Sequence, residues 1–283
     1  RPARDRQGDD RVRVRLMTAT QQAPGWGRRR LLAALTGAAL LAAALLAGLA
    51  YVLVDAVTDQ APANPVLVSS TASPASGLGW RDQVAAAPML RVDPAAAREG
   101  TPAATPGRAI VVPPATREGP AGVPTGYPRT SAGAVGQLAA IDTTVLNGMS
   151  LERTWQVHRG WALPGAPAVG QWVMTENVRA FLAAAGPAAP AGAPAAVVAI
   201  PAGGQVKGTD GPNWVVACVL LRVDATIART ASIAYGHCER MQWHEDRWQI
   251  APGTQPATAP STWPGTEQAA SAGWLAWAET GLG

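Results

Sequence analysis

Residues 214 to 223 read WVVACVLLRV, a continuous run of mostly β-branched and aliphatic side chains. A run of this kind, without alternation between apolar and polar positions, is typical of a strand that is buried on both faces. Residues 231 to 243 (ASIAYGHCERMQW) predict a second long strand, and residues 247 to 251 predict a third after a turn at residues 244 to 246. The distal part of the chain is therefore expected to contain an antiparallel sheet.

Two shorter strands are expected just before this sheet, at residues 196 to 200 and 205 to 208. Pro201 and the glycines at 203 and 204 separate them, because proline cannot donate to a strand ladder and glycine weakens a strand interior.

Three helices are expected before these strands. The first is capped by Thr130 or Ser131 and runs to Asn147, since apolar residues recur at helical spacing between these points. The second is capped by Ser150, and the third covers residues 171 to 185.

A last helix is expected near the C-terminus, capped by Ser261 or Thr262, with Trp274 and Trp277 packing it onto the rest. Helices followed by antiparallel strands and a further helix predict an α+β domain, in which helices pack on a curved antiparallel sheet. We expect this domain to occupy residues 128 to 283.

Cys218 and Cys238 are the only cysteines, and they lie ten residues on either side of Ala228. If the two long strands form a hairpin centred on Ala228, the cysteines face each other at the separation that a disulfide requires. Closing this loop would add about 3 kcal/mol of stability. Two buried free thiols are the alternative, and an oxidising compartment favours the bond.

A metal site is the competing interpretation of the same region, because His237, Cys238, Glu239 and His244 lie close together in the sequence. The chain has neither the paired CxxC nor the HExxH spacing of zinc sites. Side chains at neighbouring strand positions also point to opposite faces, so His237 and Cys238 do not converge. We therefore expect no metal site.

Tyr235, His237 and Glu239 share one face of the second long strand and form the candidate pocket. A histidine and a carboxylate on one face can act as acid and base. The alternative is a set of polar residues on a half-solvated sheet face or at the mouth of a cone. GxSxG, P-loop and GxGxxG patterns do not occur, so the sequence predicts no catalytic residue, no cofactor and no enzymatic activity.

The formal net charge of +4 comes from the N-terminal end of the chain. Residues 1 to 30 hold nine arginines and three aspartates, a net of +6, which leaves 14 basic and 16 acidic residues, a net of −2, for the remaining 253. Binding to nucleic-acid phosphates requires clustered lysines and arginines. The distal domain is therefore not expected to bind nucleic acid directly.

Residues 31 to 54 (LLAALTGAALLAAALLAGLAYVLV) form an uncharged run between the arginines at 28 to 30 and Asp55. As a helix, the run would extend about 36 Å, enough to cross a hydrocarbon core of about 30 Å. We expect a single-pass transmembrane helix that keeps the basic residues 1 to 30 in the cytoplasm and places the C-terminal domain outside.

A cleaved signal peptide is the alternative for this run, because residues 46 to 50 (LAGLA) offer small side chains near a cleavage point. Secretory apolar regions usually span about 7 to 15 residues, and this run is longer, which favours the uncleaved anchor. Residues 1 to 16 precede Met17, and whether they are translated is left open.

Residues 55 to 127 are expected to form a Pro/Ala-rich linker, since 12 of the 25 prolines lie between residues 61 and 130. This composition buries too little apolar surface to offset the entropy of ordering. As a coil, the linker would span roughly 45 to 50 Å. Within it, residues 78 to 92 (LGWRDQVAAAPMLRV) are richer in apolar side chains, and they either dock on the domain, with Trp80 as the anchor, or form one strand.

The layout of the chain resembles a known family. A basic segment, a single anchor and a Pro/Ala-rich spacer lead to residues 123 to 135 (VPTGYPRTSAGAV), which open a helix. This order is similar to membrane-anchored proteins of conjugative elements in high-GC Gram-positive bacteria. The distal part, with residues 214 to 223 and the hairpin that ends at residues 248 to 250 (WQI), is similar to TcpC-like and VirB-type scaffold subunits of type IV secretion machines.

The resemblance implies a nuclear-transport-factor-like domain, in which helices on a curved sheet form a cone, held at the cell membrane. It also implies a non-enzymatic scaffold whose partners are the membrane, other subunits of the secretion channel and further copies of the chain. The alternative function is an exported small-molecule-binding protein or enzyme that uses the cavity of the cone. A deep pocket in which His237 and Glu239 converge would favour the alternative, whereas a cavity plugged by Trp155 or Trp274 would not.

Overall fold

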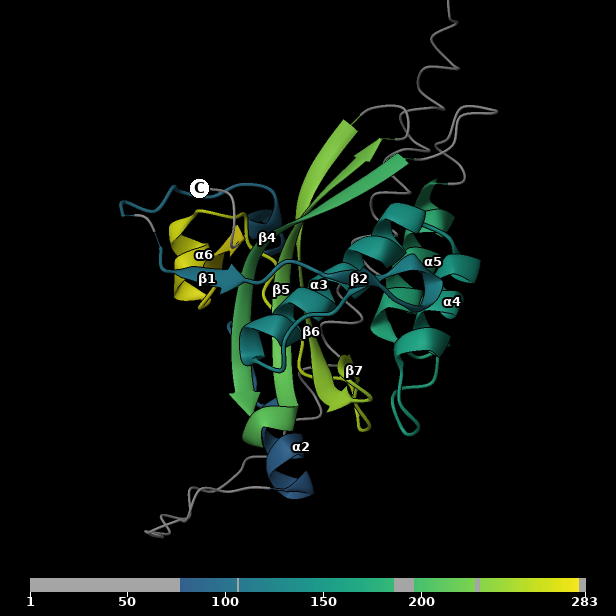
Figure 1. Ribbon diagram of the computed structural model, residues 1–283. Coiled ribbons are helices and arrows are strands. Elements are labelled where there is room, and N and C mark those ends of the chain that lie inside the picture. The colour runs from purple at the N-terminus through teal and green to yellow at the C-terminus, as the bar shows by residue number, and fades with distance from the viewer. Residues whose placement is uncertain (1–76, 106, 186–195, 227–229, 280–283) are drawn as a thin grey trace, which may run out of the picture. The chain divides into compact units, whose positions relative to one another are not determined.

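Two long strands, β5 (Trp214–Thr226) and β6 (Thr230–His244), pair along their length within a curled six-stranded sheet (Figure 1). The computed structural model describes residues 77–105, 107–185, 196–226 and 230–279. The strand order is β1-β8-β4-β5-β6-β7, and every pairing is antiparallel except that of β1 with β8. The remaining strands are β1 (Ala109–Val112), β4 (Ala196–Thr209), β7 (Arg247–Ile250) and β8 (Leu275–Glu279).

Strand β4 is continuous, whereas the sequence predicts two short strands here. Its register against β5 shifts between Pro201 and Gly203 and again between Val206 and Gly208. The proline and the glycines thus produce irregularities in one strand and do not divide it. Pro201 is tolerated because this part of β4 is a sheet edge, where its missing N–H breaks no ladder bond.

The three predicted helices are present as α3 (Ser131–Gly148), α4 (Leu151–Trp161) and α5 (Val173–Ala185). Two of them begin at predicted caps: the hydroxyl of Thr130 accepts from the backbone N–H of Gly133, and that of Ser150 accepts from Arg153.

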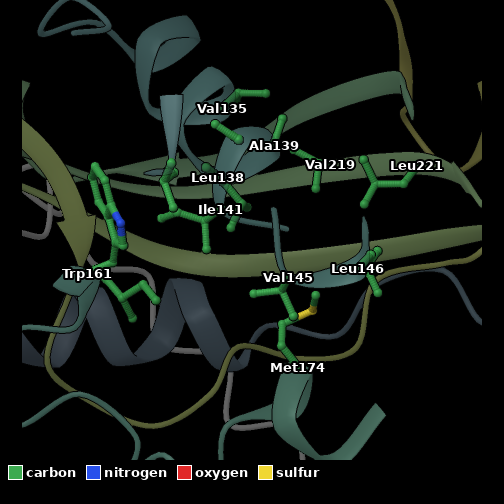
Figure 2. Close-up of a cluster of buried hydrophobic side chains, with 14 of the residues drawn as sticks. Val135, Leu138, Ala139, Ile141, Val145, Leu146, Trp161, Met174, Val219 and Leu221 are labelled. Carbon is green, nitrogen blue, oxygen red and sulfur yellow. The ribbon is translucent and has the colours of Figure 1, made fainter. Parts of the chain in front are cut away.

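These helices cover one face of the sheet. Figure 2 shows part of the resulting core, in which side chains of α3 gather with Val219 and Leu221 of β5. The α3 members labelled there are Val135, Leu138, Ala139, Ile141, Val145 and Leu146.

The opposite face of β5 is also buried. Val216, Cys218 and Leu220 belong to a second apolar cluster. Helix α2 (Leu78–Ala86), helix α6 (Glu267–Ser271) and Trp274 contribute to this cluster. The prediction that residues 214 to 223 form a strand buried on both faces is therefore confirmed from Trp214 to Val223, with only Arg222 exposed. Together with the helices, this sheet confirms the α+β class.

The prediction for the C-terminal end is wrong in detail. The last helix, α6, is short and is capped by Thr266, not by Ser261 or Thr262. Gly273, at φ +85°, follows its end, and Trp277 lies in strand β8 beside β1. Successive side chains of a strand point to opposite faces, and these five residues fit that pattern. The spacing of Trp274 and Trp277 favoured a helix instead and did not indicate the strand.

The described part of the predicted linker is folded. Residues 78 to 125 contain helix α2, strand β1 and four short elements, which are η1 (Pro94–Ala97), β2 (Arg117–Glu118), η2 (Pro120–Gly122) and β3 (Pro124–Thr125). The region folds because its few apolar residues, such as Val84, Val112 and Val123, are buried. Its prolines start two of the short helices, where the missing N–H is not needed. The folded unit therefore begins well before residue 128.

Residues 78 to 92 dock on the sheet and contain a helix, not a strand. The indole N–H of Trp80 donates to the carbonyl of Thr209 at 3.1 Å, so this tryptophan is the anchor that the sequence suggests. The predicted transmembrane segment at 31 to 54, the basic segment at 1 to 30 and residues 55 to 76 lie outside the described residues. Within the described ranges, no helix combines the length and hydropathy that a membrane crossing requires.

Candidate functional site

The cysteines face each other as predicted. Cys218 of β5 pairs directly with Cys238 of β6, and their sulfur atoms lie 1.97 Å apart, at disulfide distance. Both side chains belong to the second apolar cluster, whereas the neighbouring His237 points to the helix-covered face. Among the described residues, no group of three or more histidine, cysteine, aspartate or glutamate side chains is placed to hold a metal ion.

Tyr235, His237 and Glu239 lie on the face of β6 that meets the helices. The rings of Tyr235 and His237 are stacked with centroids 6.1 Å apart, and Nε2 of His237 lies 3.8 Å from Oε2 of Glu239. The spacing of two residues along the strand therefore brings all three side chains together, as the alternation predicts.

Asp142 of α3 completes this cluster. Its Oδ2 lies 2.8 Å from Nδ1 of His237, and both side chains are almost fully buried. Asp142 is not among the residues predicted for this site, although a signal was present: it is the only charged residue between residues 131 and 148, in a helix that is otherwise apolar or neutral. A buried charge in such a helix requires a partner, and the partner here is 95 residues away.

Burial and mutual attraction compete in setting the charges of the cluster. Burial lowers the pKa of His237, but the negative charges of Asp142 and Glu239 and the hydrogen bond that the ring donates to Asp142 outweigh burial and leave this pKa above its ordinary value. Burial raises the pKa of Asp142 and of Glu239, and attraction to His237 offsets this only in part. The cluster therefore retains protons more strongly in the folded protein than the same groups would in water.

Glu239 is held by three donors, none of which was predicted from the sequence. The indole N–H of Trp172 donates to Oε2 at 3.0 Å, and the side-chain amide of Gln255 donates to the same oxygen at 3.1 Å. The backbone N–H of Arg240 donates to Oε1 at 3.1 Å. These contacts make Glu239 a positioning residue for the segment around Gln255.

The segment that follows β7 lies directly on β6 beside the cluster. Gly236 permits this approach, because an added Cβ would lie 2.7 Å from the carbonyl oxygen of Pro260. Arg240 holds the other end, since its guanidinium donates to the carbonyl of Thr254 at 2.8 Å and to Asp82 of α2 at 2.7 Å.

A cavity of about 150 Å³ lies between α5 and this segment. Its wall includes Val173 and Asn177 of α5, Tyr235 and His237 of β6, and Gln255, with Pro256, Ala257, Thr258 and Ala259 completing the rim. Asn177 donates to the hydroxyl of Tyr235 at 2.7 Å. Glu239 lies behind this wall, where Trp172 and Gln255 hold it.

Neither tryptophan that was considered as a plug fills this cavity. Trp155 is 40% exposed on α4, and Trp274 packs in the second apolar cluster, with its N–H on the carbonyl of Pro260. The cavity is nevertheless smaller than the roughly 300 to 1,000 Å³ of ordinary ligand pockets.

A second feature of the surface is the strand-end arm, which consists of residues 196–201 of β4, 221–226 of β5 and 230–235 of β6. Figure 1 shows these strand ends together at one end of the sheet. Their helix-covered face is buried, because Val197, Ala199 and Val223 lie in the core under the helices. Val198 and Ile200, which share one face of the arm, are each 50% exposed.

On the same face, Arg222 and Ser232 both donate to Asp224. The arm thus presents apolar side chains beside a polar network, a composition found at protein interfaces.

The outer edge of the arm is blocked against strand addition. The side-chain oxygen of Asn147 accepts from the backbone N–H of Ala199 at 2.7 Å, and Pro201 has no N–H to offer. Natural sheets protect edges by such means. A partner would therefore contact the side chains of the arm and not its backbone edge.

Comparison with protein-family models, with curated proteins and with solved structures found no match to this chain.

Proposed function

We propose that this protein is a non-enzymatic, membrane-anchored assembly component of a conjugative DNA-transfer channel of the type IV secretion kind. Residues 31 to 54 anchor it in the cell membrane as a single-pass protein, with residues 1 to 30 in the cytoplasm and the α+β unit outside. The uncharged run with its preceding arginines supports this topology. The helices packed on a curled antiparallel sheet agree with the domain that the resemblance implies.

The strand-end arm is the observation that carries the proposal. Single exposed apolar residues are common on protein surfaces. Val198 and Ile200, however, are two residues apart on the face of the sheet opposite the helices, so they expose adjoining apolar area. We propose that this face contacts other channel subunits, and that further copies of the chain are among them.

Replacing Val198 and Ile200 together by serine tests this function in cells that carry the conjugative element. The variant should reach the membrane at the wild-type level but reduce DNA transfer by about tenfold or more, since losing about 1.4 kcal/mol at an interface weakens it tenfold. Val111→Ser is the matched control, because Val111 is a strand valine that is 52% exposed elsewhere on the sheet. Unchanged transfer after deletion of the whole gene would contradict the proposed function.

A further inference from the structure

A hollow of about 330 Å³ lies beside helix α6, where strands β4 and β8 meet. Its volume is within the roughly 300 to 1,000 Å³ of ordinary ligand pockets. Solvent reaches several of the residues that line it, because Thr105, Ala270 and Ala276 are exposed and Ala202 and Leu275 are half-buried. A molecule from solution can therefore enter the hollow and contact its wall.

Small residues form most of this wall. Glycine and alanine account for eight of the fourteen lining residues, namely Ala103, Gly107, Ala202, Gly203, Gly265, Ala269, Ala270 and Ala276. Ala202 is the extra residue of the bulge in β4, between Pro201 and Gly203, and it has no partner on β5. The chain therefore leaves space at this point that larger side chains would have filled.

The chemistry of the wall restricts the charge of a ligand. Among the described residues that line the hollow, none has a charged side chain. Two buried polar side chains of the wall already have partners. The hydroxyl of Thr266 donates to the carbonyl of Trp263 at 2.7 Å and accepts from the N–H of Ala269 at 3.2 Å, and the indole N–H of Trp274 donates to the carbonyl of Pro260. A charged ligand would lose hydration here without gaining a partner, so the wall favours a neutral one.

The accessible part of the wall also favours an aliphatic ligand over an aromatic one. Trp274 is the only aromatic residue among the described residues of the wall, and it is only 6% exposed, so no ring face is open for stacking. The surface that remains accessible is largely the methyl and methylene groups of Ala270, Leu275 and Ala276. An alkyl chain placed here removes its own surface and this surface from water. One polar group can stay at the rim, where the exposed Thr105 carries a hydroxyl.

We propose that the hollow beside α6 binds a neutral molecule with an alkyl chain and one uncharged polar end, of the kind represented by a medium-chain alcohol. The chain contacts Ala270, Leu275 and Ala276, and the polar end stays at the rim beside Thr105. The hollow has the liquid volume of about eleven water molecules at about 30 Å³ each, which limits the length of the chain. This inference does not rest on the assembly function, and it gives the α+β unit a binding activity of its own.

Linear primary alcohols from butanol to dodecanol test the proposal with the full chain in lipid nanodiscs. Equilibrium dialysis sets the free alcohol concentration, so uptake by the lipid does not change it. The indole resonance of Trp274, assigned with Trp274→Phe, reports binding because this residue lines the hollow. The indole resonance of Trp80, which is bonded to Thr209, is the reference. We expect a saturable shift of the Trp274 resonance, with a millimolar dissociation constant for hexanol.

The dependence on chain length distinguishes a bounded hollow from an open surface. Affinity should rise about fourfold for each added methylene, the amount that burying one methylene supplies. Dodecanol is larger than the hollow and should bind no more tightly than decanol. Hexanoate and hexylammonium match hexanol in chain length but carry a charge, and they should bind at least tenfold more weakly.

A variant that fills the hollow supplies the second readout. Ala270→Phe should abolish the shift caused by hexanol and leave the Trp80 resonance in place. Ala180→Phe is the matched control, because Ala180 is an exposed alanine of helix α5 that does not line the hollow. Absence of a saturable shift in the wild-type protein, or a shift that survives in folded Ala270→Phe, would overturn the proposed site. Affinity that still rises at dodecanol would show uptake on an open surface, and equal or tighter binding of a charged probe would overturn the ligand class.

Discussion

Breaking the bond between Cys218 and Cys238 is a perturbation whose effect can be worked out from the structure. The cysteines are 20 residues apart, so the bond closes a loop of that length in the unfolded chain. The relation between loop length and lost entropy gives about 3 kcal/mol for such a loop at 25 °C. We therefore expect chemical reduction to lower the free energy of unfolding by about 3 kcal/mol.

Urea unfolding followed by tryptophan fluorescence measures this loss, since Trp161, Trp172, Trp214 and Trp248 are fully buried. With a urea dependence of about 1 to 3 kcal/mol per molar, the midpoint should fall by about 1 to 3 M. The double variant Cys218→Ala with Cys238→Ala is the control, because reductant should leave its midpoint unchanged. Equal midpoints for oxidised and reduced wild-type protein would show that the bond does not stabilise the fold. Free thiols, detected by alkylating the denatured, exported protein without reductant, would show that the bond does not form.

Three further predictions concern the buried cluster and the sheet edge. Asp142→Asn leaves His237 without its charged partner, so the free energy of unfolding should fall by about 3 to 5 kcal/mol in urea titrations; a loss below about 1 kcal/mol would contradict a buried ion pair. Because the pKa of His237 is raised on folding, its stabilising contribution is complete below the ordinary value of 6.5 and is lost as the pH rises through the folded value. Urea midpoints measured from pH 6 to pH 9 should therefore fall in the wild-type protein and change less in His237→Gln; parallel curves would be the opposing result. Asn147→Ala removes the acceptor for the Ala199 amide and should cost about 0.5 to 1.5 kcal/mol, with faster hydrogen exchange at that amide; unchanged exchange would show that the edge is protected by other means.

The central hairpin could be predicted because the information for it is local. Alternation along a strand decides which side chains share a face, so Tyr235, His237 and Glu239 came together in the structure as expected. The symmetric placement of Cys218 and Cys238 about the connection likewise decided their pairing. The helix caps at Thr130 and Ser150 are short-range hydrogen bonds, which depend on a few neighbouring residues.

Contacts between distant segments could not be predicted in the same way. Asp142 reaches His237 from a helix 95 residues earlier, and Trp172 reaches Glu239 across 67 residues. No local pattern encodes such pairings. The docking of residues 78 to 92 was among the predictions, but the folding of residues 93 to 125 was missed for a related reason, because Val112 and Val123 are buried only by surfaces that other segments provide. Composition alone describes a segment in isolation, and this segment is stable only against the sheet.

The proposed anchoring of the α+β unit outside the membrane can be tested directly on protoplasts that express the full chain with a tag at each end. Protease added to intact protoplasts should remove the C-terminal tag and leave a membrane-embedded fragment with the N-terminal tag. A C-terminal tag that survives until the protoplasts are lysed, or a released product that begins beyond Ala50, would contradict the anchored topology and the assembly role built on it.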